Sequence, residues 1–323
     1  MRAMHSWTRR ITPGLALAFA LVAIGAATRV IAVEEPIASL WNAPTDLAAR
    51  DLFAGPWGAD AAPDPHATYT FLRPKKGGVN PGVVVRDEQG RVWHVKQPPH
   101  NSQGAEGPVE VVLSRVLAAV GYHQPPVYFL PSFTLRDASG VRTEAGGRFR
   151  LDDRTLRSVG TWSWHRNPFV GTQPYNGLLV ILLMFNSWDL KDSNNTLYER
   201  RSADGRVERW YVVRDLGAAL GETGRLAPKR NNIDRFERAR FISNVDRDGF
   251  VSFTYHGWQP GLLHHTITRD DVRWAAALVG GLSDRQWRDA FRAGGYPEDL
   301  AARFIAKIDA NVGAAAGVRY CAG

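Results

Sequence analysis

The hydrophobic pattern of the first half of the chain, after the N-terminus, predicts a sheet with one helix. Three short extended runs joined by turn residues predict an antiparallel meander, at residues 67–72, 83–86 and 91–96. Apolar residues then recur at helical spacing from Pro108 to Val120, with a proline in the first turn and Gly121 after the last. Extended runs at 127–135 and 148–151 complete a mostly antiparallel sheet.

Beyond Asp152 the pattern predicts a mainly helical region. The longest apolar run after the N-terminus lies within 176–188, which is typical of a helix buried on all sides and too short to cross a membrane. A polar loop and two short extended pieces, 196–198 and 210–213, follow it. Three amphipathic stripes predict helices near the C-terminus, at 268–279, 283–293 and 297–312.

The first 32 residues resemble an export signal. Arg2, Arg9 and Arg10 precede an uncharged, apolar run from 11 to 28. Cleavage after Ala32 is expected, and an uncleaved anchor is the alternative, which would be the protein's sole attachment to a membrane. Either outcome places the body of the chain outside the cytoplasm, as a periplasmic or secreted protein.

Charge and cysteine content exclude two classes of protein. The chain has a net charge of +8, of which the leader's arginines contribute four, and the remaining bases are scattered among acids. We therefore expect no nucleic-acid partner. The single cysteine, Cys321, excludes an intramolecular disulfide, so stability must come from a core. The length suits one large domain or two lobes that share a cleft.

Five chemistry-bearing positions lie on or beside the predicted elements. Lys96 ends the third extended run, and Glu110 lies on the helix that follows. Asp189 and Asn194 belong to the polar loop after the apolar helix, and Asp215 begins an Asp-Leu-Gly turn directly after the strand 210–213.

In this order, the segments resemble those of protein kinases. Asp189-Leu-Lys-Asp-Ser-Asn194 is similar to the kinase catalytic loop, and Asp215-Leu-Gly217 is similar to the Asp-Phe-Gly turn. The resemblance covers residues 68–221 and points to a distant, atypical member, near the secretory-pathway, spore-coat and bacterial toxin kinases. It implies a two-lobed α+β fold with a small antiparallel-sheet N-lobe, one helix in that lobe, and a mainly helical C-lobe. The expected division is a signal peptide or anchor (1–32), an N-terminal extension (33–66), a nucleotide-binding lobe (67–152) and a catalytic lobe (153–323).

The resemblance also implies a role for each side chain. Asp215 and Asn194 would bind Mg²⁺ or Mn²⁺, because hard cations prefer oxygen ligands. Lys96 would contact the phosphates of ATP, or of another nucleoside triphosphate, and Glu110 would hold Lys96 in place. Asp189 would orient the attacking hydroxyl and accept its proton, since phosphoryl transfer depends on positioning and charge neutralisation.

The sequence departs from the kinase pattern in two places. Ser187-Trp188 stands where kinases have His-Arg, and no GxGxxG motif is present. Anchoring of the phosphates would fall to a weaker glycine-containing turn, with candidates Lys75, Lys76, Gly77 and Gly78. Glu106 is the alternative partner of Lys96, although its place before Pro108 predicts a loop.

Several alternatives stay open. The acceptor is a hydroxyl of unknown origin, on a protein or a small molecule. A catalytically silent binding or scaffold module, or nucleotidyl transfer, would use the same residue types. Residues 244–249 imitate the start of a calcium loop, but Tyr255 stands at the twelfth position, where the bidentate Glu is required, so we predict a hairpin turn. Taken alone, Lys96 at a strand end is more typical of a solvated edge.

Overall fold

The structure, a computed structural model, describes residues 35–77, 80–99, 105–202, 204–222 and 229–318. The predicted leader, Gly78 and Cys321 lie outside the described residues. The chain from Glu35 onward groups into one unit by its internal contacts. Among the described residues, no helix combines the length and apolar character that a membrane crossing needs.

Five strands close into a barrel in the order β2-β3-β4-β6-β5. Their bounds are β2 (Thr68–Pro74), β3 (Gly82–Arg86), β4 (Val92–Lys96), β5 (Val127–Asp137) and β6 (Gly140–Leu151). The antiparallel meander β2–β3–β4 is confirmed. Alternate side chains, among them Val85, Trp93 and Phe149, fill the barrel interior because successive residues of a strand point to opposite faces.

The closure of the barrel was not predicted. β2 pairs in parallel with β5, which joins the two edges of the expected open sheet. β6 is also longer than the expected run 148–151, because its glycines allow neighbouring strands to approach closely. A Cβ on Gly146 would lie 1.8 Å from the carbonyl oxygen of Leu130, and one on Gly147 would lie 2.1 Å from that of Lys96.

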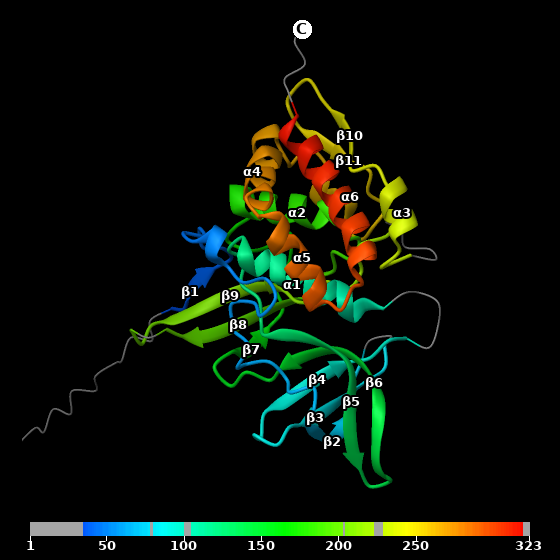
Figure 1. Ribbon diagram of the computed structural model, residues 1–323. Coiled ribbons are helices and arrows are strands. Elements are labelled where there is room, and N and C mark those ends of the chain that lie inside the picture. Colours follow the sequence, from blue (N-terminus) through cyan, green and yellow to red (C-terminus); the bar gives the residue numbers. More distant parts are fainter. Residues whose placement is uncertain (1–34, 78–79, 100–104, 203, 223–228, 319–323) are drawn as a thin grey trace, which may run out of the picture. The chain divides into compact units, whose positions relative to one another are not determined.

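Helix α1 (Glu106–Ala119) begins two residues earlier than predicted and is almost entirely buried. It packs against β5 and β6 on one side and against α5 on the other. Gly121, expected to end the helix, follows it with a φ of 102°, a conformation that favours glycine. Figure 1 shows α1 between the barrel and the helices of the C-terminal half.

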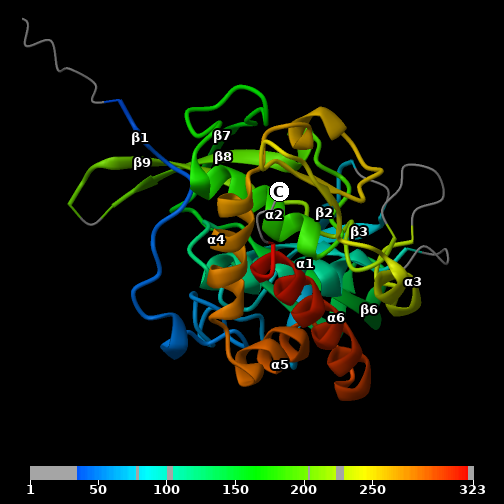
Figure 2. The ribbon, with the colours of Figure 1, turned by 90° about the horizontal axis from the view of Figure 1, so that it is seen from above.

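The region beyond Asp152 contains more strand than predicted. A second sheet has the order β1-β9-β8-β7, formed by β1 (Ile37–Ser39), β7 (Arg157–Gly160), β8 (Asn195–Arg201) and β9 (Val207–Val213). The segment before the barrel supplies β1, which runs parallel to β9 (Figure 2). The predicted hairpin around 246–249 is confirmed as β10 (Ile242–Val245) and β11 (Val251–Phe253).

The remaining helices surround a second hydrophobic core. They are α2 (Gln173–Met184), α3 (Ile233–Arg238), α4 (Arg269–Gly280), α5 (Asp284–Ala293) and α6 (Glu298–Ala316). Ten consecutive residues of α2, from Tyr175 to Met184, are buried, as its apolar run predicted. The mixed α and β content agrees with the predicted class, with the barrel as the main difference.

Candidate functional site

One cavity of about 800 Å³ collects the predicted site residues that the structure describes. These are Lys75, Lys76, Gly77, Lys96, Glu110, Asp189, Asn194 and Asp215. They come from the β2–β3 turn, β4, α1, the loop after α2 and the turn after β9. Only tertiary structure brings these segments together, since Lys96 and Asp215 are 119 positions apart.

The ammonium group of Lys96 lies among three carboxylates. It donates to Glu106 Oε2 at 3.0 Å, to Asp215 Oδ1 at 2.9 Å, and to Glu110. Lys96 is 5% exposed, so the alternative of a solvated edge residue is wrong. A buried ammonium requires such partners, because its desolvation is costly unless it is paired and hydrogen-bonded.

Two arginines that the sequence did not indicate balance the charge of this cluster. Arg148 on β6 pairs with Glu110, and Arg230 pairs with Glu106. Three cations therefore face three carboxylates. Arg148 pairs with Lys96 in the β4–β6 register, so the two residues are neighbours on adjacent strands of the barrel. No local sequence pattern predicts a role for Arg148 or Arg230, because strand pairing and the packing of distant segments bring them to the cluster.

Glu106 does not lie in a loop, as we expected, but in the first turn of α1. Pro108 falls inside the first turn, where its missing N–H costs nothing, so the helix extends before it. Glu106 and Glu110 are four residues apart and therefore lie on one face of the helix, which directs both carboxylates to Lys96. Proline at the third helical position was the signal that could have predicted this.

Asp215 reaches the cluster from the turn after β9, and its side chain is 46% exposed. Desolvation acts to raise its pKa, but the charge of Lys96 and hydrogen bonds to the carboxylate outweigh it and hold the pKa well below the ordinary value of 3.8. The carboxylate is therefore ionised at neutral pH. Ligand atoms of Glu106, Glu110 and Asp215 lie within 4.8 Å of one another, a spacing that a cation could bridge.

The antiparallel pairing of β8 with β9 joins the two polar loops. Asn195 pairs with Val213, so the start of β8 lies beside the end of β9. As a result, the carbonyl oxygen of Asn194 accepts from the amides of Arg214 at 2.9 Å and Asp215 at 3.4 Å. The side-chain amide of Asn194 donates to the carbonyl oxygen of Asp189 at 2.6 Å, which closes the loop.

Asp189 has a basic neighbour, and hydrogen bonds of the preceding residue's backbone fix its position in the loop. Lys191 Nζ lies 2.7 Å from Asp189 Oδ1, and the same ammonium lies 4.5 Å from the ring centre of Trp258. The backbone of Trp188, the residue before Asp189, makes two hydrogen bonds to neighbouring segments. Its amide donates to the carbonyl oxygen of Ala218 at 3.2 Å, and its carbonyl accepts from the amide of Trp258 at 2.9 Å.

The side chain of Lys75 makes hydrogen bonds within the glycine-containing turn. Lys75 Nζ donates to the carbonyl oxygens of Gly77 at 2.9 Å and Asn80 at 3.0 Å. Burial, followed by the charges of Lys96 and Arg148, lowers the pKa of Lys75 below 10.5. Its ammonium is therefore near the charged cluster, although its hydrogen bonds go to backbone.

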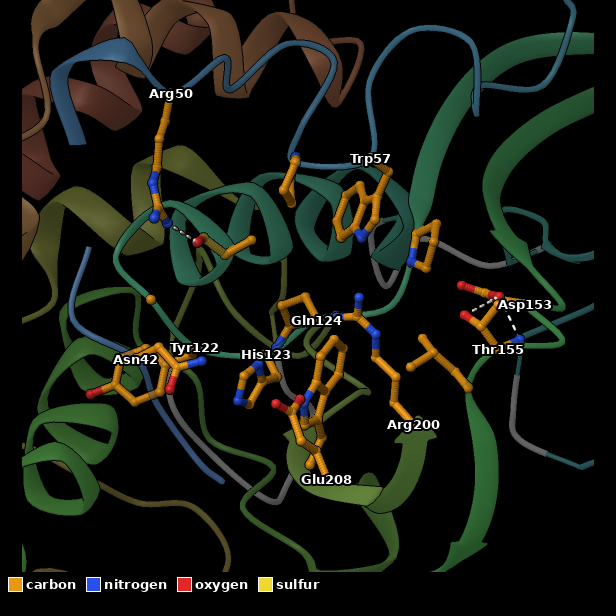
Figure 3. Close-up of a pocket in the computed structure, with 16 residues that line it drawn as sticks. Asn42, Arg50, Trp57, Tyr122, His123, Gln124, Asp153, Thr155, Arg200 and Glu208 are labelled. Carbon is orange, nitrogen blue, oxygen red and sulfur yellow. Dashed lines mark hydrogen bonds between the residues drawn. The ribbon is translucent and has the colours of Figure 1, made fainter. Parts of the chain in front are cut away.

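A second cavity, of about 590 Å³, lies beside the C-terminal end of α1, and its lining includes none of the predicted site residues that are described. Figure 3 shows Arg50, His123, Asp153, Arg200 and Glu208 among the side chains that line it. The ring of His123 stacks on Trp210 at 4.3 Å between ring centres. Burial lowers the pKa of His123 to about 4, so this imidazole is neutral at pH 7.

No family model and no curated protein matches the sequence. Among solved structures, a Helicobacter pylori proinflammatory kinase, CtkA, aligns with 79% of this chain and with all of its own chain. The two share 11% sequence identity, and the TM-score is 0.35. At this TM-score the architectures have too little in common for a role to pass from one protein to the other.

Proposed function

We propose that the chain is a kinase-like phosphotransferase, which moves the γ-phosphate of a metal-bound nucleoside triphosphate to a hydroxyl acceptor. The observation that carries the proposal is the meeting of Lys96, Asp189, Asn194 and Asp215 in one cavity, with Lys96 Nζ 2.9 Å from Asp215 Oδ1. Phosphoryl transfer needs little covalent chemistry, and needs cations and oxygen ligands held in place around a triphosphate. A cavity of this volume is of the size that binds small molecules.

The residues present suit a divalent cation of the Mg²⁺ or Mn²⁺ type. Asp215 is ionised, half-exposed and directed into the cavity, and Asn194 lines the same wall. Glu106 and Glu110 lie close enough to contribute, but each already pairs with two cationic side chains. Asp215 and Asn194 would therefore hold the metal, which, when bound, neutralises charge on the phosphates.

The protein's own side chains have distinct tasks in this proposal. Lys96, fixed by Glu106 and Glu110, would contact the phosphates as a positioned point charge. Asp189 would hydrogen-bond the attacking hydroxyl and accept its proton as the bond to phosphorus forms. Lys75 and Lys76, with the backbone at Gly77, would cover the phosphates from the β2–β3 turn.

We extend the proposal to architecture and location. The barrel and α1, within 67–152, would act as the nucleotide-binding lobe of a two-lobed kinase-like fold, and 153–323 as the catalytic lobe that bears Asp189 and Asp215. The leader would export the protein to the periplasm or the exterior, or anchor it at its N-terminus.

The test uses the purified full-length chain with Mg²⁺ or Mn²⁺ and γ-labelled ATP. We expect metal-dependent release or transfer of label, slowed about 10²- to 10⁴-fold in Asp189→Asn if this carboxylate is the general base. Asp270→Asn, at an exposed position outside the cavity, is the matched control.

Binding is measured separately from turnover. Metal-nucleotide at about 100-fold excess over Kd should stabilise the folded state by about 2.7 kcal/mol, and Asp215→Ala should abolish the gain. No stabilisation of the unmodified protein would overturn the binding claim. Stabilisation without turnover would leave a silent binding module, and transfer of α-label in place of γ-label would show nucleotidyl transfer.

A further inference from the structure

Two rows of side chains cross the outer face of the barrel wall and line the cavity. The inner row contains Lys96 and Arg148, which face each other in the β4–β6 register. The outer row lies two residues away along each strand, where His94 faces Arg150. Side chains two residues apart on a strand share a face, so both rows point away from the barrel interior and into the cavity.

A β-bulge extends the outer row with a further arginine. Val84 of β3 pairs with His94, and a register shift in β2 between Phe71 and Arg73 brings Arg73 opposite Val84. Without the shift, Arg73 would share the inward face of Phe71, which packs against the barrel core. Bulges commonly redirect a side chain beside a binding site, and here the bulge places a guanidinium at the cavity.

Arg214 adds a fourth basic group from the end of β9. It lines the same cavity, and it is close enough to Arg150 for its charge to contribute to lowering the pKa of Arg150, after burial and Arg148. His94 is kept neutral, because burial and the charge of Arg150 lower its pKa to about 4. Strands β2 and β6 and the end of β9 thus bring three permanent positive charges to one region.

The two rows differ in charge balance. The inner row is neutralised by Glu106, Glu110 and Asp215, as described above. In the outer row, Asp152 Oδ2 lies 4.0 Å from His94 Nε2, whereas Arg73, Arg150 and Arg214 form no ion pair with a carboxylate among the residues that the structure describes. Neighbouring guanidinium groups repel one another, and Arg150 and Arg214 are partly buried while Arg73 is exposed, so an anion that joins the three would relieve their repulsion.

We propose that Arg73, Arg150 and Arg214 form a second anion subsite in this cavity, which binds a phosphate group. Planar guanidinium groups match phosphate oxygens through paired N–H donors, and several arginines around one anion are typical of phosphate recognition. The subsite deepens the proposed function and rests on it for its meaning. The ligands of this site carry a phosphate in addition to the triphosphate at Lys96 and Asp215.

Two sources supply this chemistry, and they predict different competition. An acceptor that is already phosphorylated would bind beside the nucleotide. A nucleotide with a further phosphate on its sugar would bring the group itself, so an analogue that carries this phosphate would displace free phosphate, whereas an ordinary ATP analogue would leave the subsite open.

The experiment measures inorganic phosphate binding to the full-length chain by calorimetry, at constant ionic strength, with and without saturating magnesium and a non-hydrolysable ATP analogue. The measurement is repeated with an analogue that carries a further phosphate on its ribose. We expect Arg150→Gln to weaken phosphate binding about tenfold or more, since a lost charge-assisted hydrogen bond is worth at least that factor. Arg136→Gln, an exposed β5 arginine outside the cavity, is the matched control and should match the unmodified protein. If Arg150→Gln lowers the melting temperature of the protein, Arg73→Gln provides a second test of the same subsite from β2.

Each outcome decides one question. Phosphate binding that survives saturation with either analogue and weakens in Arg150→Gln supports the subsite and assigns it to the acceptor. Binding that survives the ATP analogue but is displaced by the ribose-phosphorylated analogue, again weakened in the variant, assigns it to the nucleotide. Binding that the ATP analogue itself displaces lies at the triphosphate position and overturns the subsite. Equal phosphate affinity in both variants and the unmodified protein, or no phosphate binding, overturns the subsite. If the ATP analogue fails to bind while phosphate binding still depends on Arg150, the proposed function is overturned and the subsite is not.

Discussion

Replacing Glu110 by glutamine should be the most destabilising conservative change in the charged cluster. The Glu110 carboxylate is 4% exposed and contacts Lys96 and Arg148, which are 6% and 5% exposed at their side chains. Lys96 keeps Glu106 and Asp215 after the change, whereas Arg148 loses its only ion-pair partner among the described residues. Breaking a buried pair by removing one partner costs about 3–5 kcal/mol. Because Lys96 stays paired, we expect about 3 kcal/mol.

The assay is urea unfolding of the full-length chain, since urea leaves charges unscreened. The midpoint should fall with an unchanged slope, which indicates that stability changed and the unfolded state did not. Glu222→Gln removes one partner of an exposed pair with Arg235 and should cost no more than about 1 kcal/mol. If Glu110→Gln costs as little as Glu222→Gln, then the cluster is hydrated and its buried charge balance does not hold the site together.

Three further predictions follow from the structure. Gly217→Ala should destabilise the protein by about 1–3 kcal/mol in the same urea assay, because the new Cβ would lie 2.5 Å from the Cβ of Glu106. The control is Gly313→Ala in α6, where the new Cβ meets open space and should stabilise the helix by up to about 1 kcal/mol. Burial lowers the pKa values of His94 and His123 from 6.5 to about 4, so the folded state binds fewer protons than the unfolded chain. The free energy of unfolding should therefore be highest above about pH 6.5 and fall toward pH 4, by at most about 1.4 kcal/mol per pH unit for each histidine. Each His→Gln variant should flatten this plot of stability against pH. Chelation of divalent metal should remove the stabilisation by nucleotide and leave the melting temperature of the nucleotide-free protein unchanged, which a thermal scan with and without chelator checks.

Local patterns alone predicted most of the individual elements. The meander 67–96, the buried helix around 176–184 and the C-terminal helices are confirmed, because alternation and helical spacing follow from which face of an element is covered. The hairpin at 246–249 is confirmed for the same local reason, since its turn residues leave few other conformations.

The sequence by itself determined which residue types were available to the cavity, and the kinase-like order of motifs named Lys96, Glu110, Asp189, Asn194 and Asp215. It could not determine their neighbours. Closure of the barrel, the pairing of β1 with β9 and the gathering of arginines from β2, β6 and the end of β9 depend on contacts between distant segments, which no local pattern encodes. The tertiary structure alone decided that three cations balance three carboxylates in one part of the cavity, while three arginines elsewhere in it form no ion pair within the described part of the chain. The physical reason is that charge balance is a property of side chains that folding brings together.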